Sequence, residues 1–127
     1  MTPRQLPHAR RVVAKAARVL RKCAPVGCPV QVRWQRTCPG LPFRMGQCEG
    51  WFDRRTGRPR SARITIYWAP AEGIQHVLDS LLHEWAHVPH GSPTARTDDH
   101  WHGPRFYRRL GEVNRAFDRA AATRRRR

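Results

Sequence analysis

The run PAEGIQHVLDSLLHEWAH, residues 70–87, decides how the chain is expected to fold. Its large apolar residues recur at helical spacing, which predicts a helix with one continuous face for packing against a core. These residues are Ile74, Val77, Leu78, Leu81, Leu82 and Trp85. Pro70 in the first turn and Glu72 near the positive end of the helix are typical of a helix start. We therefore expect a rigid helix whose other positions are free to carry chemistry.

The flanking segments predict an α+β domain around this helix. An N-terminal helix, three strands and a C-terminal helix are expected at residues 8–22, 30–34, 44–52, 62–68 and from Gly103-Pro104 onward. Ile64 and Ile66 alternate with polar neighbours, which is the pattern of a half-buried strand. We expect the strands to form a small three-stranded antiparallel sheet. Residues 1–7 should be a disordered lead, residues 8–122 the folded domain and residues 123–127 a basic arginine tail.

Length and charge limit the class of protein. The chain of 127 residues has room for one domain, and no stretch approaches the roughly 20 apolar residues of a membrane helix. We expect a monomeric cytoplasmic protein with no membrane partner. The formal net charge of +16 comes from 25 Lys and Arg against 9 Asp and Glu, which indicates a polyanionic partner such as DNA. An arginine-rich composition typical of a GC-rich genome explains part of the same charge.

Two helices carry basic residues from which a DNA-binding surface could be built. On the N-terminal helix, four of them repeat at intervals of four, three and four and share one face: Arg11, Lys15, Arg18 and Lys22. A phosphate backbone could lie along this stripe, although an ordinary solvated helix face gives the same pattern. The C-terminal helix adds Arg105, Arg108 and Arg109. These seven residues are the expected nucleic-acid contacts, with the arginine tail beside them.

His83, Glu84 and His87 form an HExxH motif within the expected central helix. Four residues make about one helical turn, so the two imidazoles should lie side by side at the spacing that a tetrahedral zinc ion spans. Glu84 would lie beside the metal without bonding to it, where it can accept a proton from zinc-bound water. The motif therefore predicts a hydrolytic zinc centre with Glu84 as the general base. Two surface histidines on an amphipathic helix are the simpler alternative.

A third metal ligand must lie elsewhere in the chain, because catalytic zinc usually has three protein ligands and one open position. The candidates after the motif are His90, Asp98, Asp99, His102 and Glu112. His90 is only three residues beyond His87, and Pro89 should redirect the chain there. Glu112 would give a site with two histidines and a glutamate, and Asp98 or Asp99 a site with an aspartate. The residue types alone leave these alternatives open.

The run HGPRF, residues 102–106, bears on this choice. His102 follows His87 by fifteen residues, and HExxH followed at that distance by HGPxF resembles the SprT-like (Spartan-type) zinc metalloprotease family, which includes a protease that cleaves proteins crosslinked to DNA. The segments Met45–Cys48 and Ile64–Ile66 are similar to strands that precede the family's active helix. The resemblance implies a minimal zincin-like domain with one catalytic Zn2+ held by His83, His87 and His102. Members often carry a later zinc ribbon or DNA-binding extension, whereas no cysteine follows Cys48 here.

We therefore predict a zinc-dependent metalloendopeptidase of SprT-like type that hydrolyses peptide bonds with a zinc-activated water and acts on DNA-associated proteins. The protein substrate is expected to add as an extended strand to the edge of residues 62–68. Tyr107 or His100 could donate a hydrogen bond to the oxyanion. The alternative is a basic DNA-binding protein in which the zinc is structural. A zinc endoribonuclease is a weaker fit, because that motif needs a third histidine where Pro93 stands.

The four cysteines all lie in the first half of the chain, at Cys23, Cys28, Cys38 and Cys48. None of them forms the CxxC pair that is typical of a structural zinc site. Without a secretion signal, reduced and partly buried thiols are expected. A second, structural zinc ion and disulfide bonds are the alternatives.

Overall fold

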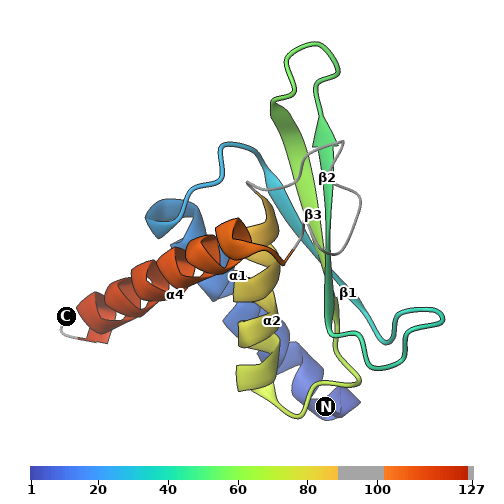
Figure 1. Cartoon of the computed structure of the whole chain (residues 1–127). Coiled ribbons are helices and arrows are strands. Elements are labelled where there is room, and N and C mark those ends of the chain that lie inside the picture. The colour runs from blue at the N-terminus through green and yellow to red at the C-terminus, as the bar shows by residue number, and fades with distance from the viewer. Residues whose placement is uncertain (89–101, 126–127) are drawn as a thin grey trace.

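The described part of the chain is residues 1–88 and 102–125 of the computed structural model (Figure 1). Its helices are α1 (Leu6–Cys23), α2 (Ile74–His87) and α4 (Pro104–Arg125), and a 3-10 turn, Pro3–Gln5, precedes α1. Its strands are β1 (Val30–Gln35), β2 (Gly46–Phe52) and β3 (Pro59–Tyr67). The expected α+β class and the expected order of the elements are confirmed.

The sheet is mixed and has the strand order β1-β3-β2. β2 and β3 are joined by a short turn and pair antiparallel, with Cys48 opposite Ile64. β3 lies between β2 and β1 and runs parallel to β1, with Val32 opposite Ile64. The expectation of an entirely antiparallel sheet is therefore wrong for one pairing, because the second strand of the hairpin, and not the first, contacts β1.

β3 is the central strand, and this changes two expectations. Ile64, Thr65, Ile66 and Tyr67 are all buried, so this part of the strand is buried on both faces rather than on one. Both edges of β3 are paired, so a substrate strand cannot add to it and the expected docking edge is wrong. Among the described strands, none pairs with the outer edge of β2, which makes β2 the open strand next to α2.

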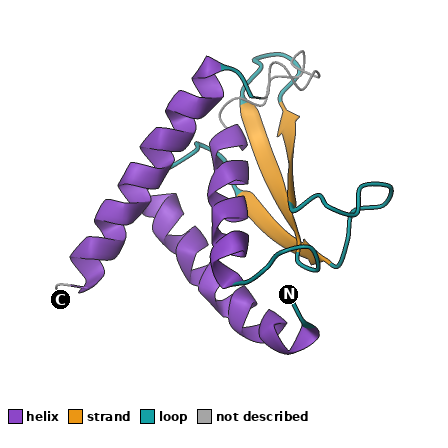
Figure 2. Cartoon of the chain, turned by 60° about the horizontal axis from the view of Figure 1, so that its bottom comes forward, coloured by secondary structure: helices purple, strands orange, loops and turns teal. Residues whose placement is uncertain are grey.

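The helices cover one face of the sheet, as Figure 2 shows. α2 contacts α1, α4, β2 and β3, and therefore occupies the middle of the domain. Its apolar face is buried as expected, with Val77, Leu81 and Trp85 fully enclosed. The indole N–H of Trp85 donates a hydrogen bond of 2.8 Å to the backbone carbonyl of Ala24, just after the end of α1. These contacts fix α2, and with it every side chain that α2 directs toward the sheet or toward α4.

The N-terminus is ordered by hydrogen bonds, contrary to the disordered lead expected for residues 1–7. The Met1 ammonium donates to the backbone carbonyl of Ala69 at 3.1 Å and also to that of Ala71. The first residues are thereby held against the segment between β3 and α2. At the other end, α4 continues to Arg125, so the expected tail is helical as far as it is described. No helix of the described residues is long and apolar enough to cross a membrane.

Candidate metal centre

Three histidine side chains from two helices converge at one point. The Nε2 atom of His83 lies 3.2 Å from Nε2 of His102 and 3.3 Å from Nε2 of His87. One ligand nitrogen from each ring fits within a group whose atoms all lie within 4.8 Å of one another. The structure thus brings together the three histidines expected from the sequence, in a cluster that could hold a metal ion.

The helices α2 and α4 produce this convergence. His83 and His87 are one turn apart on α2, and their ring centroids are 5.0 Å apart. His102 lies two residues before the first residue of α4, and the packing of α4 on α2 carries its ring to within 5.3 Å of the His83 ring. His87 is buried, His83 is half-buried and His102 is exposed. The cluster is therefore open to solvent on the side of His102.

The electrostatic environment favours the form of histidine that binds metals. Burial is the main cause that lowers the pKa of His83, and the neighbouring His102 lowers it further. A lowered pKa keeps the imidazole neutral at physiological pH, and only a neutral ring nitrogen can donate its lone pair to a cation.

Phe106 forms an apolar wall behind the three imidazoles. Its ring stacks on His87 with centroids 4.2 Å apart and an interplanar angle of 20°. It also makes edge contacts with His83 and His102, at centroid distances of 4.9 and 5.1 Å. The sequence placed Phe106 only on the inner face of the C-terminal helix, so its part in the site was missed. Because Phe106 is only 1% exposed, it limits the rotamers open to all three rings.

Glu84 lies beside the cluster in a largely buried position, with 7% of its surface exposed. Burial raises its pKa to about 7, and the positive charge of Arg44 lowers it in part. A carboxyl group whose pKa is near 7 can accept a proton and release it again at neutral pH. A buried carboxyl group with this pKa could exchange a proton near neutral pH, as the hypothesis of Glu84 as a general base requires.

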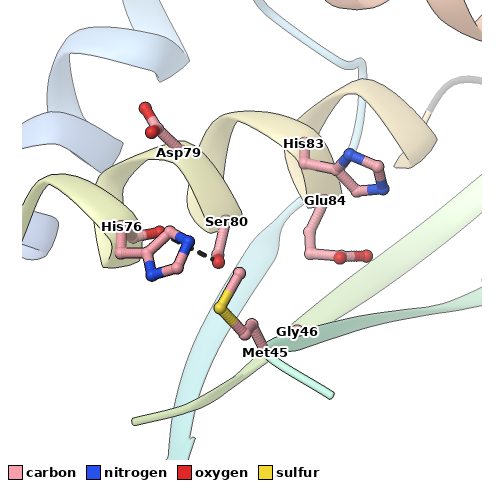
Figure 3. Close-up of a pocket in the computed structure, with 7 residues that line it drawn as sticks. All are labelled: Met45, Gly46, His76, Asp79, Ser80, His83 and Glu84. Carbon is pink, nitrogen blue, oxygen red and sulfur yellow. Dashed lines mark hydrogen bonds between the residues drawn. The ribbon is translucent and has the colours of Figure 1, made fainter. Parts of the chain in front are cut away.

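A cavity of about 400 Å³ adjoins Glu84, between α2 and the start of β2 (Figure 3). Its lining residues are Met45, Gly46, His76, Asp79, Ser80, His83 and Glu84. Figure 3 shows the Glu84 carboxylate pointing from α2 toward Gly46, whereas Asp79 points away from Met45. His76 and Ser80 were not among the site residues expected from the sequence. The available signal was their position on α2, with Ser80 about one turn and His76 about two turns before His83.

Gly46 brings the backbone of β2 close to Glu84. A Cβ atom added at this position would lie 2.9 Å from both Cγ and Oε2 of Glu84, closer than real Cβ contacts. The bare backbone of Gly46 therefore makes room for the Glu84 side chain. The sequence predicted a strand here but gave no reason to link this glycine to Glu84.

The structure separates the other third-ligand candidates from the cluster, as far as they are described. Glu112 lies on α4 with half of its side chain exposed, and its carboxylate contacts the guanidinium of Arg109 at 3.6 Å. It does not belong to the group of convergent ligand atoms found among residues 1–88 and 102–125. His90, Asp98, Asp99 and His100 lie outside the described residues.

The remaining residues expected from the sequence lie on the surface. Tyr107 is 61% exposed and contacts Phe106 by its ring edge, and it does not line the cavity at Glu84. The four basic residues of the α1 stripe are exposed, as are Arg105 and Arg108, while Arg109 is half-buried. Val12 and Val19 of α1 line a groove with Phe117 and Ala121, so α1 faces the later turns of α4. The α1 stripe therefore lies on the helix that faces the later turns of α4, whereas Arg105, Arg108 and Arg109 lie in the first turns of α4.

The four cysteines are free and half-buried, as expected for reduced thiols. The pKa of Cys48 is raised to about 12, first by burial and then by the nearby Glu84 and Cys28. A thiol with such a pKa stays protonated at neutral pH and is therefore a weak nucleophile. Among the described residues, the only ligand group of three or more side chains is the histidine cluster.

Replacing Gly46 with alanine is expected to displace Glu84 while leaving the three histidines in place. The added methyl group must push the carboxylate aside, which costs about 1–3 kcal/mol as overpacking does elsewhere in cores. We expect unchanged metal content and a clear loss of any activity that depends on Glu84. Metal analysis and activity assays on Gly46→Ala test this. Gly73→Ala is the matched control, since a Cβ at Gly73 meets nothing within 4 Å, and equal activity of the two variants would contradict the contact's importance.

Comparisons with known proteins leave this geometry as the main guide to function. No protein-family model matches the chain, and neither a curated protein nor a solved structure matches it.

Proposed function

We propose that the chain is a zinc-dependent metalloendopeptidase with His83, His87 and His102 as zinc ligands and Glu84 as the general base. The observation that carries this proposal is the convergence of three imidazoles beside a buried carboxyl group and an open cavity, with Nε2 of His83 lying 3.2 Å from that of His102 and 3.3 Å from that of His87. The resemblance of the HExxH and HGPRF motifs to SprT-like metalloproteases supports the same assignment.

The spacing of the nitrogens fits a tetrahedral zinc ion. Zinc–nitrogen bonds of about 2.0–2.1 Å at tetrahedral angles hold two ligand atoms about 3.3–3.4 Å apart. The separations from His83 to His87 and to His102 agree with this value within 0.2 Å. Three neutral imidazoles leave a fourth position for water or substrate, which is the ligand pattern of catalytic rather than structural zinc sites.

The chain's own residues define the chemistry at the site. When bound, zinc would supply Lewis-acid activation of water and of the scissile carbonyl. Glu84 would take the proton from the attacking water and deliver it to the leaving amine. A cation nearby favours the ionised carboxylate, so loading the site would bring Glu84 into its base form at neutral pH. Gly46 leaves room for this side chain, and Phe106 keeps water away from the rear of the histidine rings.

The edge of β2 that no described strand pairs with is the best-placed edge for an extended substrate. The Tyr67 N–H donates to the Met45 carbonyl at 3.0 Å, so Met45 faces β3. In an antiparallel ladder the bonding side alternates, and the backbone groups of Gly46, Cys48 and Gly50 therefore face outward. The Arg44 Nε–H donates to the outward Gly46 carbonyl at 3.1 Å. A substrate strand would replace this bond and gain further backbone hydrogen bonds beside Glu84.

A basic DNA-binding protein with a structural zinc ion is the second candidate. The net charge of +16 and the exposed arginines favour it. Against it stand the exposure of His102 and the cavity of about 400 Å³ at Glu84, because structural zinc sites have four protein ligands and are closed. If the natural substrates are DNA-associated proteins, the positive charge would bind the DNA while the metal centre cleaves the attached protein.

The two candidates are separated by incubating the zinc-loaded protein with casein and with DNA, each alone and both together. A zinc peptidase should cleave casein or its own chain. Cleavage should stop when a chelator removes the zinc and resume when zinc is added back. Stimulation by DNA would tie the basic surface to substrate choice. No cleavage of casein or of the chain under any of these conditions, together with salt-dependent DNA binding, would favour the structural-zinc alternative.

A further inference from the structure

The β2–β3 hairpin concentrates positive charge at a place distinct from α1 and α4. Between positions 54 and 63 five of ten residues are arginines: Arg54, Arg55, Arg58, Arg60 and Arg63. The first four are exposed and Arg63 is half-buried. In Figure 1 the hairpin stands clear of the helices at the end of the sheet. The arginines can therefore reach a partner without displacing another element.

The turn at the tip is built to hold these arginines outward. The Asp53 carboxylate accepts hydrogen bonds of 2.9 Å from the backbone N–H groups of Arg55 and Thr56. The Asp53 N–H donates to the Arg58 carbonyl at 2.8 Å, and Gly57 adopts a left-handed φ of 72°. The Asp53 carboxylate is thereby bonded into the backbone of the turn, and the charge of Arg60 acts on it as well. The four exposed arginines outnumber this one carboxylate, so the tip presents a cationic surface.

An exposed aromatic ring lies on the same hairpin, on the face of the sheet opposite the helices. Trp51 is 44% exposed, and the guanidinium of Arg63 lies over its ring at 5.2 Å from the centroid. Both residues border a shallow cavity of about 330 Å³, with Gln31 and Ser61 among its other lining residues. The Nε–H group of Arg63 is buried, yet within the described residues it has no hydrogen-bond acceptor. Glu49 is opposite Arg63 in the sheet register, but the described ion pairs do not join them.

We propose that this hairpin surface, made of the five arginines and Trp51, binds single-stranded nucleic acid. Arginines along a ribbon neutralise the phosphates, and an exposed tryptophan provides a stacking surface for a base. An unpaired strand is favoured over a duplex because stacking on Trp51 requires a base that is free of its partner. The guanidinium of the half-buried Arg63, which lies over the ring, adds a positive charge beside the stacking position.

The position of the hairpin connects it to the metal centre through one strand. Gly46 contacts Glu84 at the start of β2, and Trp51 lies five residues further along, roughly 17 Å away at the rise of a strand. A nucleic acid bound at the hairpin would hold its attached protein along the edge of β2 that no described strand pairs with. This consequence for substrate choice rests on the proposed peptidase function, whereas the binding itself does not.

The test measures binding without any cleavage, using Glu84→Gln protein and fluorescent strands of about twelve nucleotides. The probes are oligo(dT), oligo(U) and a duplex of the same length. We expect the single strands to bind more tightly than the duplex. Tighter binding of either single strand supports the proposal, and a preference between oligo(dT) and oligo(U) shows whether the ligand is DNA or RNA. The triple variant Arg55→Ala, Arg58→Ala, Arg60→Ala should weaken single-strand binding by about tenfold or more and reduce the salt slope by about 2.

A matched triple variant away from both the hairpin and the α1 stripe controls for net charge. Arg4→Ala, Arg10→Ala, Arg36→Ala removes three exposed arginines and should change single-strand affinity by less than about twofold. Trp51→Ala should weaken binding by about tenfold and Trp51→Phe should restore most of it, since phenylalanine can still stack. Equal weakening by the two triple variants, tighter duplex binding, or wild-type affinity of Trp51→Ala would each overturn the proposal. Thermal melting of every variant confirms that it is folded.

Discussion

Glu84→Gln is expected to reduce peptide-bond cleavage by about 10²–10⁴-fold while the protein keeps its zinc. The amide has nearly the same shape as the carboxyl group and cannot accept the proton from the attacking water. Glu84 is not one of the three convergent ligands, so the metal cluster should be intact. Initial rates of casein cleavage, with zinc content measured on the same preparations, test both parts. A variant that cleaves as fast as the parent would remove Glu84 from the mechanism.

Glu112→Gln is the matched control for this experiment. Glu112 is an exposed carboxylate on α4 that contacts Arg109 at 3.6 Å and lies apart from the histidine cluster. Loss of this surface ion pair should cost at most about 1 kcal/mol of stability and leave cleavage unchanged. Equal loss of activity in both variants would point to a general effect of the lost charge rather than to a base at position 84.

The sequence predicted the chemical core of the site because that core is local. His83, Glu84 and His87 lie within one helical turn, and helical spacing alone sets which face they share. His102 needed the resemblance of HGPRF to a known family, because no helical or strand periodicity connects it to His87, fifteen positions earlier in the sequence. The structure places its ring beside the other two.

The features that the sequence did not predict are those that depend on how distant segments meet. Gly46 is a plain strand residue until β2 is seen to pass directly beneath Glu84. Phe106 reads as an ordinary core residue until its ring is found against all three histidines. The mixed sheet has the same cause, since strand periodicity reveals which residues face the core but not which neighbour a strand pairs with.

His102→Ala is expected to abolish stoichiometric zinc binding, with affinity reduced by more than about 100-fold. Two histidines on one helical turn still provide two nitrogens 3.3 Å apart, but a two-ligand site holds zinc weakly. Zinc at a thousandfold excess over its dissociation constant stabilises the wild type by about 4 kcal/mol, which raises Tm by on the order of 10–20 °C for a domain of this size. The variant should lose most of this zinc-dependent shift. Metal analysis and melting curves with and without added zinc measure both effects.

His8→Ala and Glu112→Ala serve as controls for the loss of zinc. His8 is an exposed histidine on α1, and its removal should leave zinc content and the Tm shift unchanged. Glu112→Ala addresses the competing ligand, because a site with two histidines and a glutamate would lose zinc in this variant and keep it in His102→Ala. That reversed pattern would overturn the three-histidine centre. The 3.2 Å separation of the His83 and His102 nitrogens, against the exposed position of Glu112 beside Arg109, leads us to expect the opposite.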